Sequence, residues 1–191
     1  YTYDNKVHKP GVVVKNSSGK VIPATKYTVT YPNTKSIGKV IVKITFNGEY
    51  SGTSSRSFKI VPKASAITRT QNTASGIKIT WSKSTNAGGY LIQRKKGNGR
   101  YVTIKTIKSN KILSYIDTAA NKQGVRYAYR VQAYKTVSGV TCSAAASAGK
   151  AQYYVKPVGV SSAANKSVKK LTVTWKKNTA VTGYQIQYAG N

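Results

Sequence analysis

Apolar and polar residues alternate over two neighbouring stretches in the middle of the chain, 76–81 and 89–94. An apolar side chain at every second position is the period of a β-strand that turns one face to a core. The apolar positions are Ile77, Ile79 and Trp81 in the first stretch and Tyr90 and Ile92 in the second. We therefore predict two strands that bury these side chains against a common core.

The same pattern returns near the C-terminus, where Trp175 takes the place of Trp81 and Tyr184 takes that of Tyr90. The members of each pair are 94 residues apart. A period of that size is an internal repeat of one domain. We predict an N-terminal unit (1–62) that is a small immunoglobulin-like β-sandwich, a complete module in the middle unit (63–152), and the first strands of a second, incomplete module in the C-terminal segment (153–191).

Short alternating runs separated by turn residues fill the N-terminal unit, and its sequence has no helical period. Such runs are typical of a small antiparallel sandwich. The expected strands are 11–15 and 20–22, joined as a hairpin by the turn 16–19, and then 27–31, 40–46 and 56–61.

The middle unit has the strand count of an immunoglobulin-like sandwich, about seven strands in about 90 residues. The sequence Gly97-Asn98-Gly99 predicts a hairpin turn between two of them. The expected strands lie near 66–70, at 76–81, 89–94, 100–107, 114–117 and 127–134, and between 139 and 151.

These motifs resemble the fibronectin type III module. The matching residues are Ile77-x-Ile79-x-Trp81, Gly89-Tyr90-x-Ile92, Tyr115-x-Asp117 and Gly124-x-x-Tyr127-x-Tyr129-x-Val131-x-Ala133. The resemblance implies that Trp81 is the core tryptophan of the second strand and that Tyr90 is its partner on the third. It also implies that Tyr127 is a corner tyrosine whose hydroxyl bonds to the preceding loop. Trp175 and Tyr184 take the first two roles in the incomplete module.

The fold class predicted from these patterns is all-β, with tandem immunoglobulin-like and fibronectin type III-like antiparallel β-sandwiches. The N-terminal unit is similar to small immunoglobulin-like repeats that accompany such modules in surface proteins of Gram-positive bacteria. Its matching stretches are 1–7, 27–31, 37–38 and 48–53. The resemblance implies a bacterial protein at the cell surface or secreted from the cell.

The charge balance is extreme, because 32 lysine and arginine residues face three acidic ones and the formal net charge is +29. The acidic residues are Asp4, Glu49 and Asp117. Such a surface attracts polyanions, and salt screens the attraction. The alternative is that the charge serves solubility alone.

The densest basic cluster is Arg94-Lys95-Lys96, with Arg100 across the predicted hairpin turn. Four cations at one hairpin end repel one another unless water or an anion neutralises them. These four residues are the candidate polyanion contact, and a solvated hairpin end is the alternative. Lys169-Lys170 and Lys176-Lys177 form weaker clusters of the same kind.

Little in the sequence could perform catalysis or bind a cofactor or metal. Cys142 and His8 are the single cysteine and histidine, and the three acids are scattered. We predict no catalytic residue, no metal site, no cofactor and no intrachain disulfide. Asp117 is interpreted as a turn cap in preference to a partner in an isopeptide crosslink. The sequence contains no helix that could read a nucleic-acid groove, so we expect no specific nucleic-acid binding. No apolar run is long enough to cross a membrane.

The function predicted from the sequence is that of a non-catalytic, extracellular spacer and adhesion array. Its expected partners are anionic cell-wall polymers or host glycans and other modules of the same protein. One alternative is a set of accessory modules in a large secreted enzyme that acts on glycans or peptidoglycan, and another is a structural filament or surface-layer component. The incomplete module further predicts that its core is covered either by further chain or by strands of another molecule through self-association.

Overall fold

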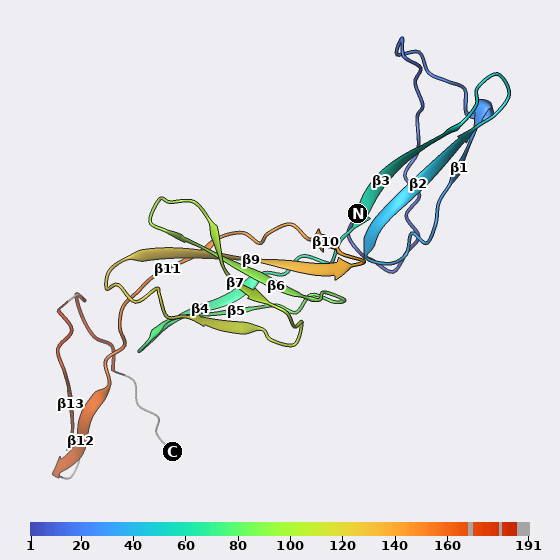
Figure 1. Cartoon of the computed structure of the whole chain (residues 1–191). Helices are drawn as coiled ribbons and strands as arrows, with labels where there is room; N and C mark the ends of the chain where they lie inside the picture. Colours follow the sequence, from blue (N-terminus) through green and yellow to red (C-terminus); the bar gives the residue numbers. More distant parts are fainter. Residues whose placement is uncertain (168–169, 180, 187–191) are drawn as a thin grey trace.

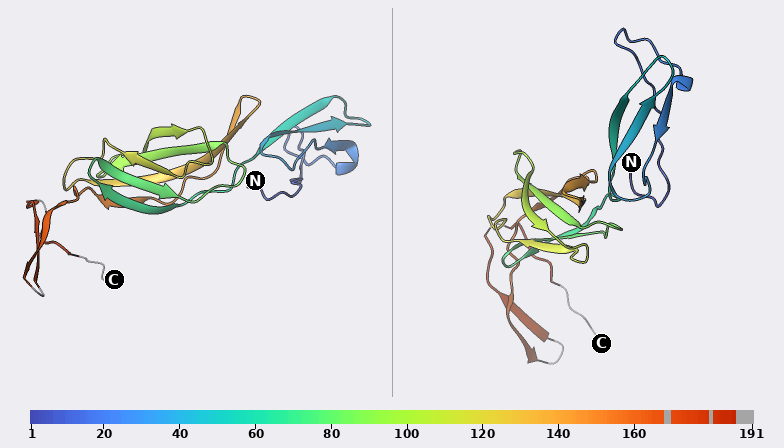
Figure 2. Two further views of the ribbon diagram at one scale, coloured as in Figure 1. Left: turned by 90° about the horizontal axis from the view of Figure 1, so that it is seen from below. Right: turned by 45° about the vertical axis from the view of Figure 1, so that its right-hand side comes forward.

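The computed structural model describes residues 1–167, 170–179 and 181–186, and it consists almost entirely of antiparallel β-strands (Figure 1). Within these ranges the one helix is the 3-10 turn η1 (Ala24–Lys26). The predicted all-β class is confirmed. Figures 1 and 2 show the three groups of strands following one another in an elongated arrangement.

The N-terminal unit contains one antiparallel sheet in the order β1-β2-β3. Its strands are β1 (Tyr27–Thr30), β2 (Gly38–Phe46) and β3 (Thr53–Ile60). The alternation predicted for 40–46 is present, since Val40, Val42 and Ile44 are 3–4% exposed while their neighbours on β2 face solvent. The inner face of this sheet therefore forms the core of the unit.

The hairpin expected at 11–22 is reduced to a turn with a single bridge between Lys15 and Val21. The Asn16 carboxamide oxygen accepts the amides of Ser18 and Lys20, at 3.1 and 2.9 Å, and holds the turn. Val13 and Val21 are 70% and 55% exposed. Because these two side chains pack against no core, a longer ladder of backbone hydrogen bonds would gain little stability from hydrophobic burial.

Two antiparallel sheets form the middle unit. One has the order β4-β5-β8, and the other has the order β10-β9-β6-β7 with β11 also paired to β9. The first sheet consists of β4 (Ile67–Thr73), β5 (Gly76–Trp81) and β8 (Ser114–Asp117). The second consists of β6 (Gly89–Lys96), β7 (Val102–Ile107), β9 (Arg126–Val137), β10 (Val140–Ser143) and β11 (Lys150–Tyr153).

The last strand predicted for this unit is split into β10 and β11. Between them the Val131 amide donates to the Ser147 hydroxyl, at 3.0 Å, where a regular ladder would use a backbone carbonyl. β11 ends at Tyr153, and Tyr154 belongs to the core of the middle unit with 2% exposure. This core therefore extends beyond residue 152.

The N-terminal and middle units share a small apolar cluster. Ile37, Val40 and Ile60 pack with Cys142 of β10, and these four residues are at most 6% exposed. The Lys59 ammonium donates to the Thr141 carbonyl at 3.1 Å. We call this group the junction cluster; it ties the end of β3 and the start of β2 to the β9-β10 hairpin.

The C-terminal segment begins with the antiparallel hairpin of β12 (Val160–Ser167) and β13 (Lys170–Trp175). The strand that the repeat predicts around Tyr184 is not formed as a regular strand in 181–186, and residues 187–191 lie outside the described residues. In the middle unit, a Cβ on Gly89 would lie 2.0 Å from the Ile107 carbonyl oxygen of the adjacent strand. Gly183, the equivalent of Gly89 by the 94-residue period, has no atom that close. The described residues thus supply no neighbour like β7 here.

Candidate functional site

The residues predicted as core signature of the middle unit lie between its two sheets. Trp81, Tyr90 and Tyr127 are 2%, 0% and 2% exposed. The Trp81 and Tyr90 rings meet edge to face with centroids 5.5 Å apart. The Tyr90 hydroxyl accepts the Ser84 amide at 3.0 Å. Among the described residues Tyr127 makes no hydrogen bond to the preceding loop, so the corner role implied by the resemblance is not reproduced there.

The equivalent residues of the C-terminal segment repeat this local geometry in a more open setting. The Trp175 and Tyr184 rings are 5.4 Å apart, and the Tyr184 hydroxyl bonds to the backbone of Asn178, the equivalent of Ser84. Tyr184 is nevertheless 41% exposed and Trp175 only half-buried. The local sequence is therefore enough to bring the tryptophan and tyrosine rings into contact, whereas burying them requires a second sheet.

The basic cluster predicted at the hairpin end is divided by the alternation of β6. Arg94 continues the inward phase of Tyr90 and Ile92, whereas Lys95 points outward and Lys96 and Arg100 are exposed around the turn. Gly97 occupies this turn with φ of 54°, a left-handed conformation that glycine adopts readily. The cations available at the surface here are therefore Lys95, Lys96 and Arg100.

Arg94 is engaged with Asp117 on the opposite sheet. One guanidinium nitrogen donates to both carboxylate oxygens, at 2.8 and 3.0 Å, and the Asp117 side chain is 3% exposed. The Tyr129 hydroxyl donates to the same carboxylate at 2.9 Å. Asp117 is thus a buried charge partner of Arg94, and not the side-chain turn cap that the sequence suggested. The alternation of inward and outward positions along β8 could have predicted this burial, because it places Asp117 on the face of the strand that turns toward the core.

Burial and the Asp117 charge act on the neighbouring phenols. Burial chiefly, then the Asp117 carboxylate, raises the pKa of Tyr129 well above its ordinary value. The same two causes, in the same order, raise the pKa of Tyr115. The Tyr129 phenol therefore stays a neutral hydrogen-bond donor to Asp117 at physiological pH. The network of Arg94, Asp117 and Tyr129 lies in the interior, where the Asp117 side chain is only 3% exposed.

Tyr101, which is outside the predicted core signature, positions two cations on the outer face of the sheet that contains β6, β7 and β9. The Tyr101 ring centroid lies 4.4 Å from the Arg130 guanidinium carbon and 5.4 Å from the Lys95 ammonium. These are cation–π distances. A Cβ on Gly149 would lie 2.1 Å from the Tyr101 hydroxyl, so a larger residue there would have to displace this ring. Tyr101 thereby fixes two cations on one surface.

The other two acidic residues also have cationic or titratable partners. Asp4 lies 3.0 Å from His8 Nε2, and its pKa is lowered first by the Lys6 amide and then by His8. Glu49 lies 3.1 Å from the Lys26 ammonium. All three carboxylates of the sequence are thus partnered within the described structure. Among the described residues, the remaining lysines and arginines have no side-chain carboxylate left to balance them.

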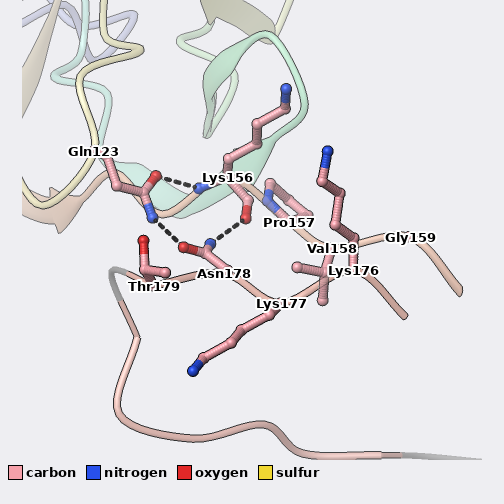
Figure 3. A pocket seen from close by; sticks show the side chains of 9 residues that line it. All are labelled: Gln123, Lys156, Pro157, Val158, Gly159, Lys176, Lys177, Asn178 and Thr179. Atoms are coloured by element: carbon pink, nitrogen blue, oxygen red, sulfur yellow. Dashed lines mark hydrogen bonds between the residues drawn. The ribbon is translucent and has the colours of Figure 1, made fainter. Parts of the chain in front are cut away.

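A solvent-open pocket of about 400 Å³ lies where the middle unit meets the C-terminal segment (Figure 3). Gln123, Lys156 and Asn178 join three chain segments in a triangle of hydrogen bonds of 3.0–3.2 Å. Lys176 and Lys177 complete the cationic part of the lining. The weaker Lys176-Lys177 cluster noted in the sequence is therefore joined by Lys156, which its position in a linker did not reveal.

No group of three or more metal-ligating side chains occurs in the part of the chain that the structure describes. Among the same residues, no helix has the length and hydropathy needed to cross a membrane. Cys142 is a free, buried thiol within the junction cluster.

The two sheets of the middle unit and the aromatic core between them define an antiparallel β-sandwich of the fibronectin type III-like class. No family model matches the sequence, and no curated protein matches it. Among solved structures, the chain is similar to a Fn3-like protein from Clostridium thermocellum. The two share 27% identity over 51% of this chain and 94% of that chain, with a TM-score of 0.35.

Proposed function

We propose that this chain is a non-catalytic modular segment of an extracellular bacterial surface protein, acting as a spacer and adhesion array. Its basic surface engages anionic cell-wall polymers or host glycans. The observation that carries the proposal is the charge arrangement. The net charge is +29, and the three carboxylates are each occupied by a partner, one of them buried.

An elongated arrangement of β-sheet units suits this role (Figure 2). Its lysines and arginines are spread over the whole sequence and can meet a polymer that is itself extended. Exposed charges attract a polyanion over roughly one Debye length, about 8 Å at physiological ionic strength. Each contact is weak alone, so affinity depends on many contacts made together. In the middle unit Lys95, Lys96 and Arg100 form the proposed hairpin contact, while Arg94 serves the core.

The experiment is a titration of the whole chain with heparin and with long-chain polyphosphate at increasing NaCl concentration. We expect binding that weakens steeply with salt. Charge reversal of Lys95, Lys96 and Arg100 to glutamate should weaken binding more than the same change at Lys39, Lys78 and Lys108, which are exposed on other strands and loops.

Each other outcome has a definite meaning. Equal losses from the two triple variants would assign the attraction to net charge and remove the hairpin contact. Binding to neither polymer, even at low salt, would reject the adhesive role.

A structural filament is the second candidate, favoured by the apolar surface of the C-terminal segment. Leu171 and Ile186 are 57% and 60% exposed, and Val160 is 64% exposed. Isolated proteins rarely leave such a group uncovered. Light scattering over a range of protein concentrations tests this candidate, which requires the mass to rise above that of the monomer.

A further inference from the structure

We propose that the pocket between the middle unit and the C-terminal segment binds a tetrahedral oxyanion, a phosphate or sulfate group carried on a polymer. This inference rests on the proposed polyanion-binding function and gives it a defined subsite. The junction pocket, as we call it, is lined by Lys156, Lys176 and Lys177 together with Gln123 and Asn178.

The chain enters the pocket from a fixed point. Tyr154 is 2% exposed, and its hydroxyl bonds to the carbonyls of Thr73 and Ala74 at 3.2 Å each. Its amide and carbonyl also pair with Val125 and Gly124, both at 2.9 Å. Residue 154 therefore belongs rigidly to the middle unit, and the linker that carries Lys156 starts two residues later.

The triangle of side-chain amides then sets the position of three segments. The Gln123 carbonyl oxygen accepts the Lys156 amide at 3.0 Å, and its nitrogen donates to the Asn178 oxygen at 3.2 Å. The Asn178 nitrogen donates to the Lys156 carbonyl at 3.2 Å. These bonds fix the backbone segments that carry Lys156, Lys176 and Lys177. Within the described residues none of these lysines has an ion pair with a side-chain carboxylate.

The internal repeat shows what is special about this junction. At the preceding junction Ser84, the equivalent of Asn178, donates to the Lys63 carbonyl at 2.5 Å. Asn178 makes the corresponding bond to the linker, and its longer side chain also reaches Gln123 across the pocket. The preceding junction is closed by the apolar junction cluster, whereas this one is polar and open to solvent.

The positive charge of the pocket lining favours binding of an anion. Its lining contains three lysines and no acidic residue, and the three carboxylates of the chain are engaged elsewhere. Figure 3 shows the Lys156 and Lys176 side chains extending in the same direction, while Lys177 points the other way. Like charges held together repel, and a bound anion removes that cost.

The type of donor favours a tetrahedral oxyanion. Lysine binds phosphate as a compact point charge, and this lining contains three lysines and no arginine. Because the Lys156 and Lys176 side chains extend in the same direction (Figure 3), we expect a group with three or four oxygens to accept from both. Pro157 and Val158 add an apolar wall that suits the hydrocarbon part of a sugar or glycerol phosphate backbone.

The test uses the full chain and two polymers, long-chain polyphosphate and heparin, in separate titrations at low salt. The pocket variant is Lys156→Gln with Lys176→Gln, and its matched control is Lys78→Gln with Lys108→Gln, which removes the same charge from exposed positions. We expect the pocket variant to bind about tenfold more weakly and the control no more than about threefold more weakly. Asn178→Ser, which restores the residue of the preceding junction, should also weaken binding without changing the charge.

The two polymers distinguish the source of the oxyanion. A selective loss with polyphosphate alone assigns the pocket to phosphate polymers, a loss with heparin alone assigns it to sulfated glycans, and a loss with both supports the shared chemistry. Equal losses for the pocket and control variants with both polymers overturn the subsite while leaving the proposed function intact. If the unmutated chain binds neither polymer, the proposed function itself fails.

Discussion

At the scale of single residues, the two tryptophans have the same local partner but different surroundings. Trp81 is buried between two sheets, whereas Trp175 is half-buried beside Tyr184. Trp81→Ala should reduce the free energy of unfolding of the middle unit by about 3–5 kcal/mol, because it removes buried apolar surface and leaves a cavity. Trp175→Ala should cost clearly less. Denaturant titration followed by far-UV circular dichroism measures both, and similar losses would contradict the difference in burial.

At the same scale, we predict that the ion pair of Arg94 and Asp117 contributes strongly to the stability of the middle unit. Arg94→Ala leaves a carboxylate that is 3% exposed without its partner, and we expect a loss of about 3–5 kcal/mol. Lys96→Ala, two positions along the same strand and exposed, should change stability by no more than about 0.5 kcal/mol. In a double-mutant cycle, Arg94→Ala with Asp117→Ala should cost less than the sum of the single variants. Additive losses would mean that the two side chains act independently.

The buried Tyr129 should make the free energy of unfolding of the middle unit depend on pH in the alkaline range. Its pKa is raised in the folded protein by burial and by Asp117, so the folded chain keeps a proton that the unfolded chain loses above about pH 10. Its contribution is therefore fully present below pH 10 and is lost as the pH rises further, with a slope of about 1.4 kcal/mol per pH unit.

Denaturant titrations at several alkaline pH values check this slope. Tyr129→Phe should flatten it relative to the unmutated chain, while Tyr153→Phe, at a side chain 58% exposed, should not. Because Tyr129→Phe also removes a hydrogen bond at neutral pH, the slopes and not the absolute stabilities are compared. An unchanged slope would place the phenol outside the buried network.

At the scale of elements, the β9-β10 hairpin serves as the contact between two units. β10 brings Cys142 and Val140 against β2 and β3 of the N-terminal unit. We predict that the Cys142 thiol reacts slowly with a disulfide reagent in the native chain, because it is 0% exposed. Val140→Ser should accelerate the reaction several-fold by weakening the junction cluster.

The control for this prediction lies on the same sheet. Val102→Ser changes a valine that is 56% exposed on β7, away from the junction cluster, and should leave the labelling rate unchanged. Rapid labelling of the unmutated chain would show that the two units separate readily. The junction cluster would then not hold them in a fixed arrangement.

At the scale of the whole molecule, the net charge of +29 acts on every unit at once. Self-repulsion destabilises a compact state, and salt screens it. We therefore predict that the midpoint of thermal unfolding rises as NaCl is added from low to physiological concentration. A midpoint that falls over this range would mean that the three ion pairs outweigh the repulsion among the unpaired cations.

Most of the strands could be predicted from the sequence, because alternation reports directly which side chains a strand buries. β2, β5, β6 and β9 follow from positions such as Val40, Trp81, Tyr90 and Val131. The hairpin predicted at 11–22 is reduced to a turn with a single bridge, and the last strand predicted between 139 and 151 is divided into β10 and β11. There the result depends on whether a facing surface exists and on a side chain, Ser147, that replaces a backbone partner. The division of the chain at residues 62 and 152 stays a prediction.

By itself, the sequence determined the all-β class, the repeated aromatic pair and the excess of positive charge, since these depend on local period and composition. The tertiary structure alone decided which charges are available. Arg94 and Lys95 are adjacent in the chain, yet Arg94 pairs with a buried carboxylate across the sandwich and Lys95 lies over the Tyr101 ring. Likewise Gln123, Lys156 and Asn178 meet only because the linker folds back beside the middle unit. Contacts between residues far apart in the chain depend on how whole sheets pack, and no local pattern encodes that packing.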